Sequence, residues 1–172
     1  MDVIEVVGIG ADGIAGVPPR LRAIIDGAEV LLGGDRHLAL VPPIAGQERR
    51  PWPRPLREHL VGLLQEFAGR RVVALASGDP FVSGIGTTLA ELLGAERVRV
   101  HPAVSSVSLA RGVLGWPAET STVVSLVGRD VSLLARELAP GHRVLVLSSD
   151  EHTPAAVAEL LCSLGYGASV LH

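Results

Sequence analysis

The chain has 172 residues, of which 48% are hydrophobic and 19% charged, enough for one large packed domain or two small ones. All fifteen basic residues are arginine, which excludes a Schiff-base lysine and the phosphate-binding lysine of a Walker motif. A net charge of -3 and an aromatic content of 3% argue against a nucleic-acid-binding protein.

The positions of the cysteine, the histidines and the apolar residues exclude further kinds of protein. Cys162 is the only cysteine, so a disulfide framework or a thiolate zinc cluster is excluded. The six histidines have no HxxxH or HxH spacing, and we expect no metal site. No apolar run approaches the ~20 residues of a membrane-spanning helix, and no basic segment precedes the first apolar run. We therefore expect a cytoplasmic protein with no membrane partner.

The first two thirds of the chain alternate apolar runs with helically spaced segments. We expect strands at 3–7, 28–32, 71–76 and 98–101. We expect helices from Pro18-Pro19 onward and at 56–67, 83–93 and 104–114. Residues 42–55 contain five prolines and are predicted to form an irregular loop.

The last third repeats this alternation. Strands are predicted at 121–127, 143–147 and 168–171, and helices at 131–138 and 153–164. Alternating strands and helices indicate an α/β fold with mostly parallel sheets. We place a domain boundary between residues 116 and 117. The second domain, 117–172, has few strands, and we expect the chain to be part of a longer protein.

The first glycine cluster matches the dinucleotide fingerprint Gly8-x-Gly10-x-x-Gly13 after a strand. That fingerprint requires the helix to start within the glycines, so that its amides meet the pyrophosphate. Here four residues separate Gly13 from Pro18-Pro19, so the predicted helix starts too late. A glycine-rich turn near another ligand is favoured over a nicotinamide site, and a purely structural turn stays open.

The Ser77-Gly78-Asp79-Pro80 segment follows a predicted buried strand. Ligands of parallel α/β sheets bind beyond the carboxyl ends of the strands, where Gly78 would allow close backbone approach. A proline turn with an Asx cap explains the same residues equally well. Ser105-Ser106 is more typical of a helix N-cap than of a ligand contact, and Asp35-Arg36-His37 is either an anion site or a solvated loop. No Gly-x-Ser-x-Gly elbow supports a hydrolase.

Several segments in chain order resemble the tetrapyrrole (precorrin) methylase family and together cover nearly the whole chain. They are VVGIG (6–10), AEVLLGGDR (28–36), ASGDPFVSGIG (76–86), PAVSSVS (102–108), SLVGR (125–129) and LSSDEHTP (147–154). The Gly-Gly-Asp-Arg and Pro-Ala-Val-Ser-Ser segments are most similar to those of the branch that methylates C5 of the corrin precursor. In some organisms that branch is fused to a domain that methylates C15 and decarboxylates.

The resemblance implies two α/β domains, the second incomplete in this chain, with the methyl donor S-adenosylmethionine between them. It also implies a homodimer and a corrin precursor as methyl acceptor. The donor contacts that the resemblance implies are Gly10, Ser77, Gly78, Asp79, Val82, Ser105, Ser106 and Val127. Arginines suit the carboxylates of such an acceptor, and the candidate acceptor contacts are Arg36, His37, Arg49, Arg50, Arg54 and Arg129.

The implied reaction moves a methyl group from a sulfonium to a ring carbon, and proximity and alignment suffice for much of its rate. This accounts for the lack of a conventional catalytic motif, and no proton acceptor is nominated. The family pattern Gly-x-Gly-Pro-Gly is broken here by Ala11-Asp12-Gly13. Three alternatives stay open: another branch acting on uroporphyrinogen, a diphthamide precursor or ribosomal RNA; a dinucleotide-dependent oxidoreductase; and a binding module without activity.

Overall fold

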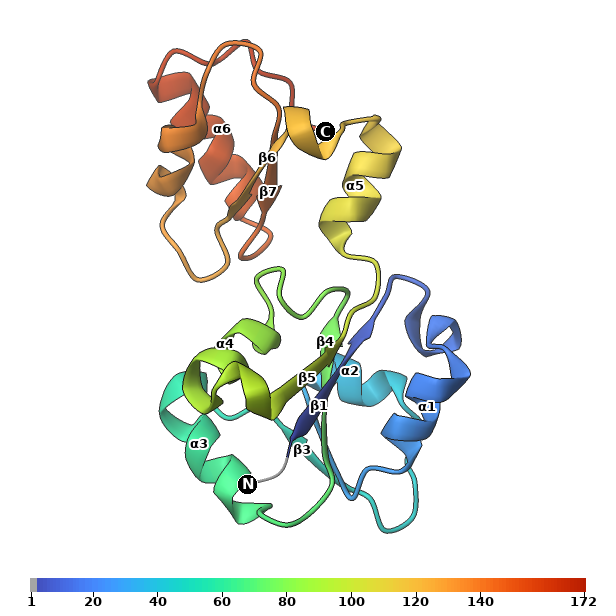
Figure 1. Cartoon of the computed structure of the whole chain (residues 1–172). Helices are drawn as coiled ribbons and strands as arrows, with labels where there is room; N and C mark the ends of the chain where they lie inside the picture. The colour runs from blue at the N-terminus through green and yellow to red at the C-terminus, as the bar shows by residue number, and fades with distance from the viewer. Residues whose placement is uncertain (1–2) are drawn as a thin grey trace. The chain divides into compact units, whose positions relative to one another are not determined.

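A computed structural model of the chain describes residues 3–172, which form two compact units (Figure 1). The first unit extends to Ser106 and the second begins at Val107. This division falls after the first residue of the helix at 106–114, whereas the boundary expected from the sequence follows that helix. No helix of the described residues is long and apolar enough to cross a membrane.

The first unit is built on a five-stranded sheet in which every neighbouring pair is parallel. Its strands are β1 (Ile4–Ile9), β2 (Val30–Gly33), β3 (Glu48–Pro51), β4 (Val72–Ser77) and β5 (Val98–His101). They lie in the order β3-β2-β4-β1-β5. The central strands β1, β2 and β4 are almost fully buried, because helices cover both faces of a parallel sheet.

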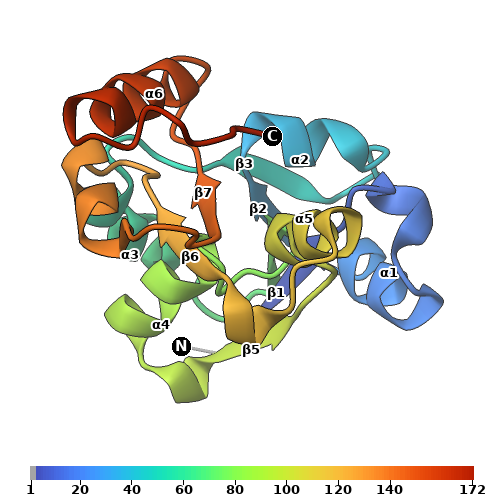
Figure 2. The same cartoon turned by 90° about the horizontal axis from the view of Figure 1, so that it is seen from above.

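Four helices cover the two faces of this sheet (Figure 2). They are α1 (Pro19–Asp26), α2 (Asp35–Leu40), α3 (Leu56–Glu66) and α4 (Ile85–Leu93). Since side chains alternate along a strand, Val7 and Leu75 pack against α1 and α2, whereas Val6 and Ala74 pack against α3 and α4. Short 3-10 turns at η1 (Gly13–Gly16) and η2 (Ala95–Arg97) complete the connections.

The strand order creates a switch point at β1 and β4. These neighbours are followed by helices on opposite faces, α1 after β1 and α4 after β4. The loops that leave their carboxyl ends therefore diverge to opposite sides of the sheet. Ligands of open α/β sheets bind in the crevice that such divergence leaves. A ligand site is therefore expected at the loops after Ile9 and Ser77.

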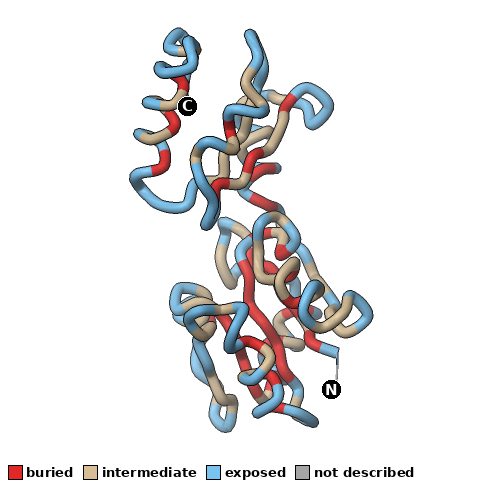
Figure 3. Tube along the Cα trace, turned by 90° about the vertical axis from the view of Figure 1, so that its left-hand side faces the viewer, coloured by how far each residue is buried: buried red, intermediate tan, exposed pale blue. Residues whose placement is uncertain are grey.

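The second unit is smaller. It contains helix α5 (Ser106–Leu114), turn η3 (Ala118–Thr120), strand β6 (Thr122–Ser125), turn η4 (Val131–Glu137), strand β7 (Val144–Leu147) and helix α6 (Thr153–Ser163). Strands β6 and β7 are parallel. Their core with η4 and α6 is formed by Leu126, Leu134, Val157 and Leu161. Figure 3 shows these buried segments in red inside an exposed outer layer.

The α/β class and the parallel sheets predicted from the sequence are confirmed, but four local predictions are wrong. Residues 42–55 contain β3, whose amides pair with the edge of β2. Asp35-Arg36-His37 begins α2 instead of a loop. Residues 168–171 pair with no strand among the described residues, so no strand forms there. The segment predicted as a helix at 131–138 is a 3-10 turn.

Candidate functional site at the strand ends

Three backbone segments meet at the carboxyl ends of β1 and β4. The Gly78 amide donates to the Ile9 carbonyl at 2.8 Å, and the Ala103 amide donates to the Gly78 carbonyl at 3.0 Å. A Cβ atom built on Gly8 would overlap the Gly78 oxygen and lie 2.9 Å from the Ala103 nitrogen. Only glycine therefore fits at position 8, and the backbone there is packed without side chains.

Gly78 has a second constraint, its backbone angle. Its φ of +48° lies in the left-handed region that side chains rarely adopt. A Cβ at this position would also lie 3.0 Å from both the Ser105 Cα and the Val104 oxygen. The Ser77-Gly78 turn consequently lies directly against the segment that precedes α5. Ser105 in that segment is 7% exposed, while Val104 is exposed.

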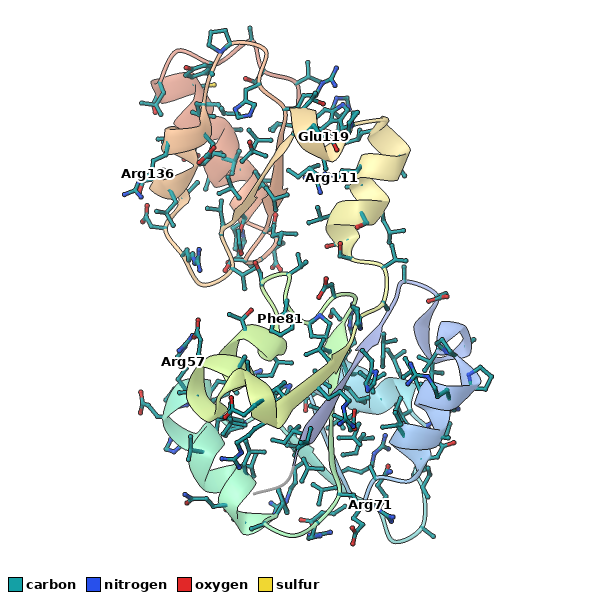
Figure 4. The ribbon with its side chains drawn as sticks, in the orientation of Figure 1. Arg57, Arg71, Phe81, Arg111, Glu119 and Arg136 are labelled. Carbon is teal, nitrogen blue, oxygen red and sulfur yellow. The ribbon has the colours of Figure 1, made fainter. Side chains whose placement is uncertain are left out.

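Asp79 shapes the loop after β4. Its Oδ1 accepts a hydrogen bond from the Phe81 amide at 2.9 Å, and its carbonyl accepts one from the Val82 amide at 3.0 Å. This is the Asx turn considered from the sequence. The turn holds Phe81 outward with 52% of its surface exposed (Figure 4).

A polar pair joins the ends of β2 and β4. His37, in the first turn of α2, has its Nε2 2.8 Å from Ser77 Oγ, and an Arg36 guanidinium nitrogen is 3.5 Å from the same oxygen. Burial, followed by repulsion from Arg36, lowers the pKa of His37 below its ordinary value. His37 is therefore a neutral imidazole at pH 7 and can accept a proton.

The first loop does not have dinucleotide-binding geometry. The Gly13 amide turns back to the Gly10 carbonyl at 3.1 Å, η1 follows, and α1 begins only at Pro19. The glycines themselves therefore form no α-helix N-terminus. The Asp12 carboxylate lies over the loop, 2.8 Å from the position of a Cβ built on Gly10. It stands in the segment where the family pattern has proline.

The expected arginines separate into two groups. Arg49 makes structural hydrogen bonds, since its guanidinium donates to the Leu38 and Val41 carbonyls at 2.6 and 2.7 Å. Arg50 pairs with Glu48 and Glu66. The two carbonyl contacts give Arg49 a structural role. The ion pairs of Arg50 lie on the surface and do not exclude a ligand role, so Arg36, Arg50, Arg54 and Arg129 remain candidates among the described residues.

The second unit has its own hollow at the ends of β6 and β7. It has a volume of about 380 Å³ and is lined by Gly128, Arg129, Asp150 and Thr153, among others. Hydrogen bonds from Thr153, then from the His152 amide, lower the pKa of Asp150, so this carboxyl is ionised at neutral pH. Val127 precedes Gly128 and is 47% exposed. The hollow is lined by one guanidinium group, that of Arg129, and by two carboxyl groups, those of Asp130 and Asp150.

The structure thus gathers most of the predicted donor contacts at one edge of the first unit, namely Gly10, Ser77, Gly78, Asp79, Val82 and Ser105. Ser106 begins α5, and Val127 and Arg129 belong to the second unit. Sequence reasoning missed the packing role of Gly8 and the participation of Ala103. It also missed the position of Asp12 over the loop. No group of three or more potential metal-ligating side chains occurs among residues 3–172.

Comparison with known proteins decides the family. Residues 3–170 match the family described as Tetrapyrrole (Corrin/Porphyrin) Methylases. The chain belongs to this family. A structure of the cobalamin biosynthesis precorrin-6Y methylase from Archaeoglobus fulgidus is similar to this tetrapyrrole methylase, with a TM-score of 0.63 and 28% identity over 89% of this chain and 76% of that one.

Two curated relatives share more of the sequence. Precorrin-6Y C(5,15)-methyltransferase (decarboxylating) from Sinorhizobium sp is 44% identical over 98% of this chain and 40% of its own length. Cobalt-precorrin-7 C(5)-methyltransferase from Salmonella typhimurium is 34% identical over 96% of this chain and 80% of its own length. The chain therefore spans about two fifths of the decarboxylating relatives that it matches.

Proposed function

We propose that this tetrapyrrole methylase transfers a methyl group from S-adenosylmethionine to C5 of a corrin precursor in cobalamin biosynthesis. The observation that carries the proposal is the side-chain-free packing of Gly8 against Gly78 at the switch point. Backbone packed this closely carries no side chain at position 8, and loops at such strand ends can hold a nucleoside through their main-chain groups. The two relatives named for C5 methylation support the choice of acceptor.

Methyl transfer from a sulfonium requires little of the protein beyond positioning the donor and the acceptor. A sulfonium is an activated leaving group, so an enzyme gains most by aligning the acceptor carbon with the methyl group and its sulfur. The loop after β4 would supply donor contacts through Ser77, Gly78, Asp79 and Val82. The first loop would add Gly10, and the segment before α5 would add Ser105 and Ser106. Val127, which the family resemblance also implies as a donor contact, stays a prediction.

The acceptor side of the site is proposed from charge. Corrin precursors carry several carboxylates, and guanidinium groups bind carboxylates through paired hydrogen bonds. Arg36 lies beside Ser77 at the same sheet edge, and Arg129 lines the hollow of the second unit. Both are proposed to hold acceptor carboxylates, with His37 adjacent.

The remaining expectations belong to this proposal. We propose a homodimer in the cytoplasm, without a bound metal, without nucleic acid, and with a C15-methylating and decarboxylating partner domain, fused or separate. The decarboxylating relative matches this chain over only two fifths of its length, which leaves room for such a domain in that protein. Methylation of uroporphyrinogen is the second candidate within the family.

Calorimetry on the full-length protein tests the donor. S-adenosylhomocysteine, the product left by the donor, should bind with one site per chain, whereas NAD should give no heat. Product formation is then followed by mass with precorrin-6Y and with uroporphyrinogen as acceptors. Binding of NAD in preference to S-adenosylhomocysteine would refute the donor assignment, and methylation of uroporphyrinogen alone would refute the acceptor assignment.

A further inference from the structure

His37 and Ser77 form a side-chain pair that donor binding alone does not require. They lie 40 residues apart in sequence and are joined at 2.8 Å across the ends of β2 and β4. Ser77 is exposed, whereas His37 is partly buried behind it. A hydroxyl that faces solvent and is backed by an imidazole is arranged to pass a proton inward.

We propose that Ser77 and His37 form a proton relay that takes up the proton released after methyl transfer. This inference rests on the proposed function, because it requires an acceptor ring at the carboxyl edge of the sheet. It assigns the proton acceptor, for which sequence reasoning nominated no residue.

The step balances without any further reactant. The ring carbon supplies the electron pair of the new C–CH₃ bond, and sulfur keeps the pair of the broken S–CH₃ bond and leaves as a neutral thioether. The methylated ring system then holds one proton more than its neutral form. Ser77 Oγ accepts this proton while its own hydroxyl proton moves to His37 Nε2, and the imidazolium that results later gives its proton to water.

The surroundings of His37 set the protonation state that the relay needs. Burial and the neighbouring Arg36 lower the pKa of the imidazole, so the ring is neutral at neutral pH and one of its nitrogens carries a lone pair. The relay requires the tautomer in which Nδ1 holds the proton and Nε2 accepts from Ser77 Oγ. The other charged groups on adjacent elements are Asp35 on α2, Glu48, Arg49 and Arg50 on β3, and Asp79 in the loop after β4. Glu48 and Arg50 pair with each other. Arg49 is committed to the Leu38 and Val41 carbonyls, and Asp79 to the Phe81 amide.

The test uses His37→Gln in the full-length protein, with His59→Gln as the matched control. His59 is an exposed histidine on α3, which packs on the other face of the sheet. His37→Gln should bind S-adenosylhomocysteine within about twofold of the wild type, which shows that the site is folded. Its kcat with precorrin-6Y should fall at least about 100-fold, the lower range for a general base. His59→Gln should keep the wild-type rate.

The pH profile separates proton uptake from a structural role. Wild-type kcat should fall as the pH drops below the ordinary histidine value of about 6.5, and this acid limb should be absent in His37→Gln. Added imidazole should restore part of the rate of His37→Ala. A variant with wild-type kcat, or one with a reduced kcat that keeps the acid limb, overturns the relay while the proposed function stands. Failure of the wild type to bind S-adenosylhomocysteine, or to methylate precorrin-6Y, refutes the proposed function and the relay with it.

Discussion

Replacing Gly8 by alanine tests the close approach of the three backbone segments. The added Cβ would overlap the Gly78 carbonyl, which accepts the Ala103 amide, so that loop has to move. Losing this hydrogen bond costs about 1 kcal/mol, and forcing packed backbone apart costs a further ~1–3 kcal/mol. Alanine regains about 0.5–1 kcal/mol by restricting the unfolded chain. The net loss in the free energy of unfolding is about 1–3 kcal/mol.

Two measurements follow from this estimate. Urea unfolding should show the stability loss, and calorimetry should show S-adenosylhomocysteine affinity reduced at least about tenfold, since the displaced carbonyl lies at the proposed donor loop. Gly62→Ala is the control, because this helical glycine in α3 has open space around its Cβ position and should gain about 0.5–1 kcal/mol. Wild-type stability and affinity in Gly8→Ala would refute the packing argument.

Three other variants test separate parts of the account. Asp79→Ala should lower S-adenosylhomocysteine affinity about tenfold with unchanged circular dichroism, because the Phe81 amide loses its acceptor; unchanged affinity removes Asp79 from the site. Arg49→Met should cost about 2–3 kcal/mol in urea unfolding, because two carbonyls lose a charged donor; a loss below about 0.5 kcal/mol would show that those bonds are dispensable. The free energy of unfolding should fall as pH drops below about 6.5, because the folded protein resists protonation of His37. His37→Gln should weaken this pH dependence of the free energy of unfolding. An equally steep dependence in the variant would show that other titratable groups cause it.

Buried strands and amphipathic helices were predictable from the sequence. A strand that is buried on both faces has a continuous apolar run, and a helix has regularly spaced apolar residues. Strand β4, with five buried residues, was predicted at 71–76 and is found at Val72–Ser77. Strand β3 was missed because an edge strand needs only one partner and few apolar side chains, and ERRP has neither apolar alternation nor length. Helix α2 was missed because six residues carry too little periodicity to be distinguished from a loop.

Only those parts of the site that directly follow a buried strand in the sequence were predictable. Ser77-Gly78-Asp79 follows a buried strand, and the carboxyl end of such a strand is where ligands bind. The pairing of His37 with Ser77 depends on β2 lying next to β4, which the order of the strands in sequence does not give. The same holds for Gly8, since its constraint arises from Gly78 and Ala103, distant in sequence and adjacent only in the sheet.

A crystal structure of the full-length protein with S-adenosylhomocysteine would test the central claim most directly. We predict the nucleoside against the backbone at 8–10 and 77–82, with Gly78 and Asp79 within hydrogen-bond distance of it. Density for the nucleoside at any other place, with those two loops filled by the protein's own side chains, would contradict it.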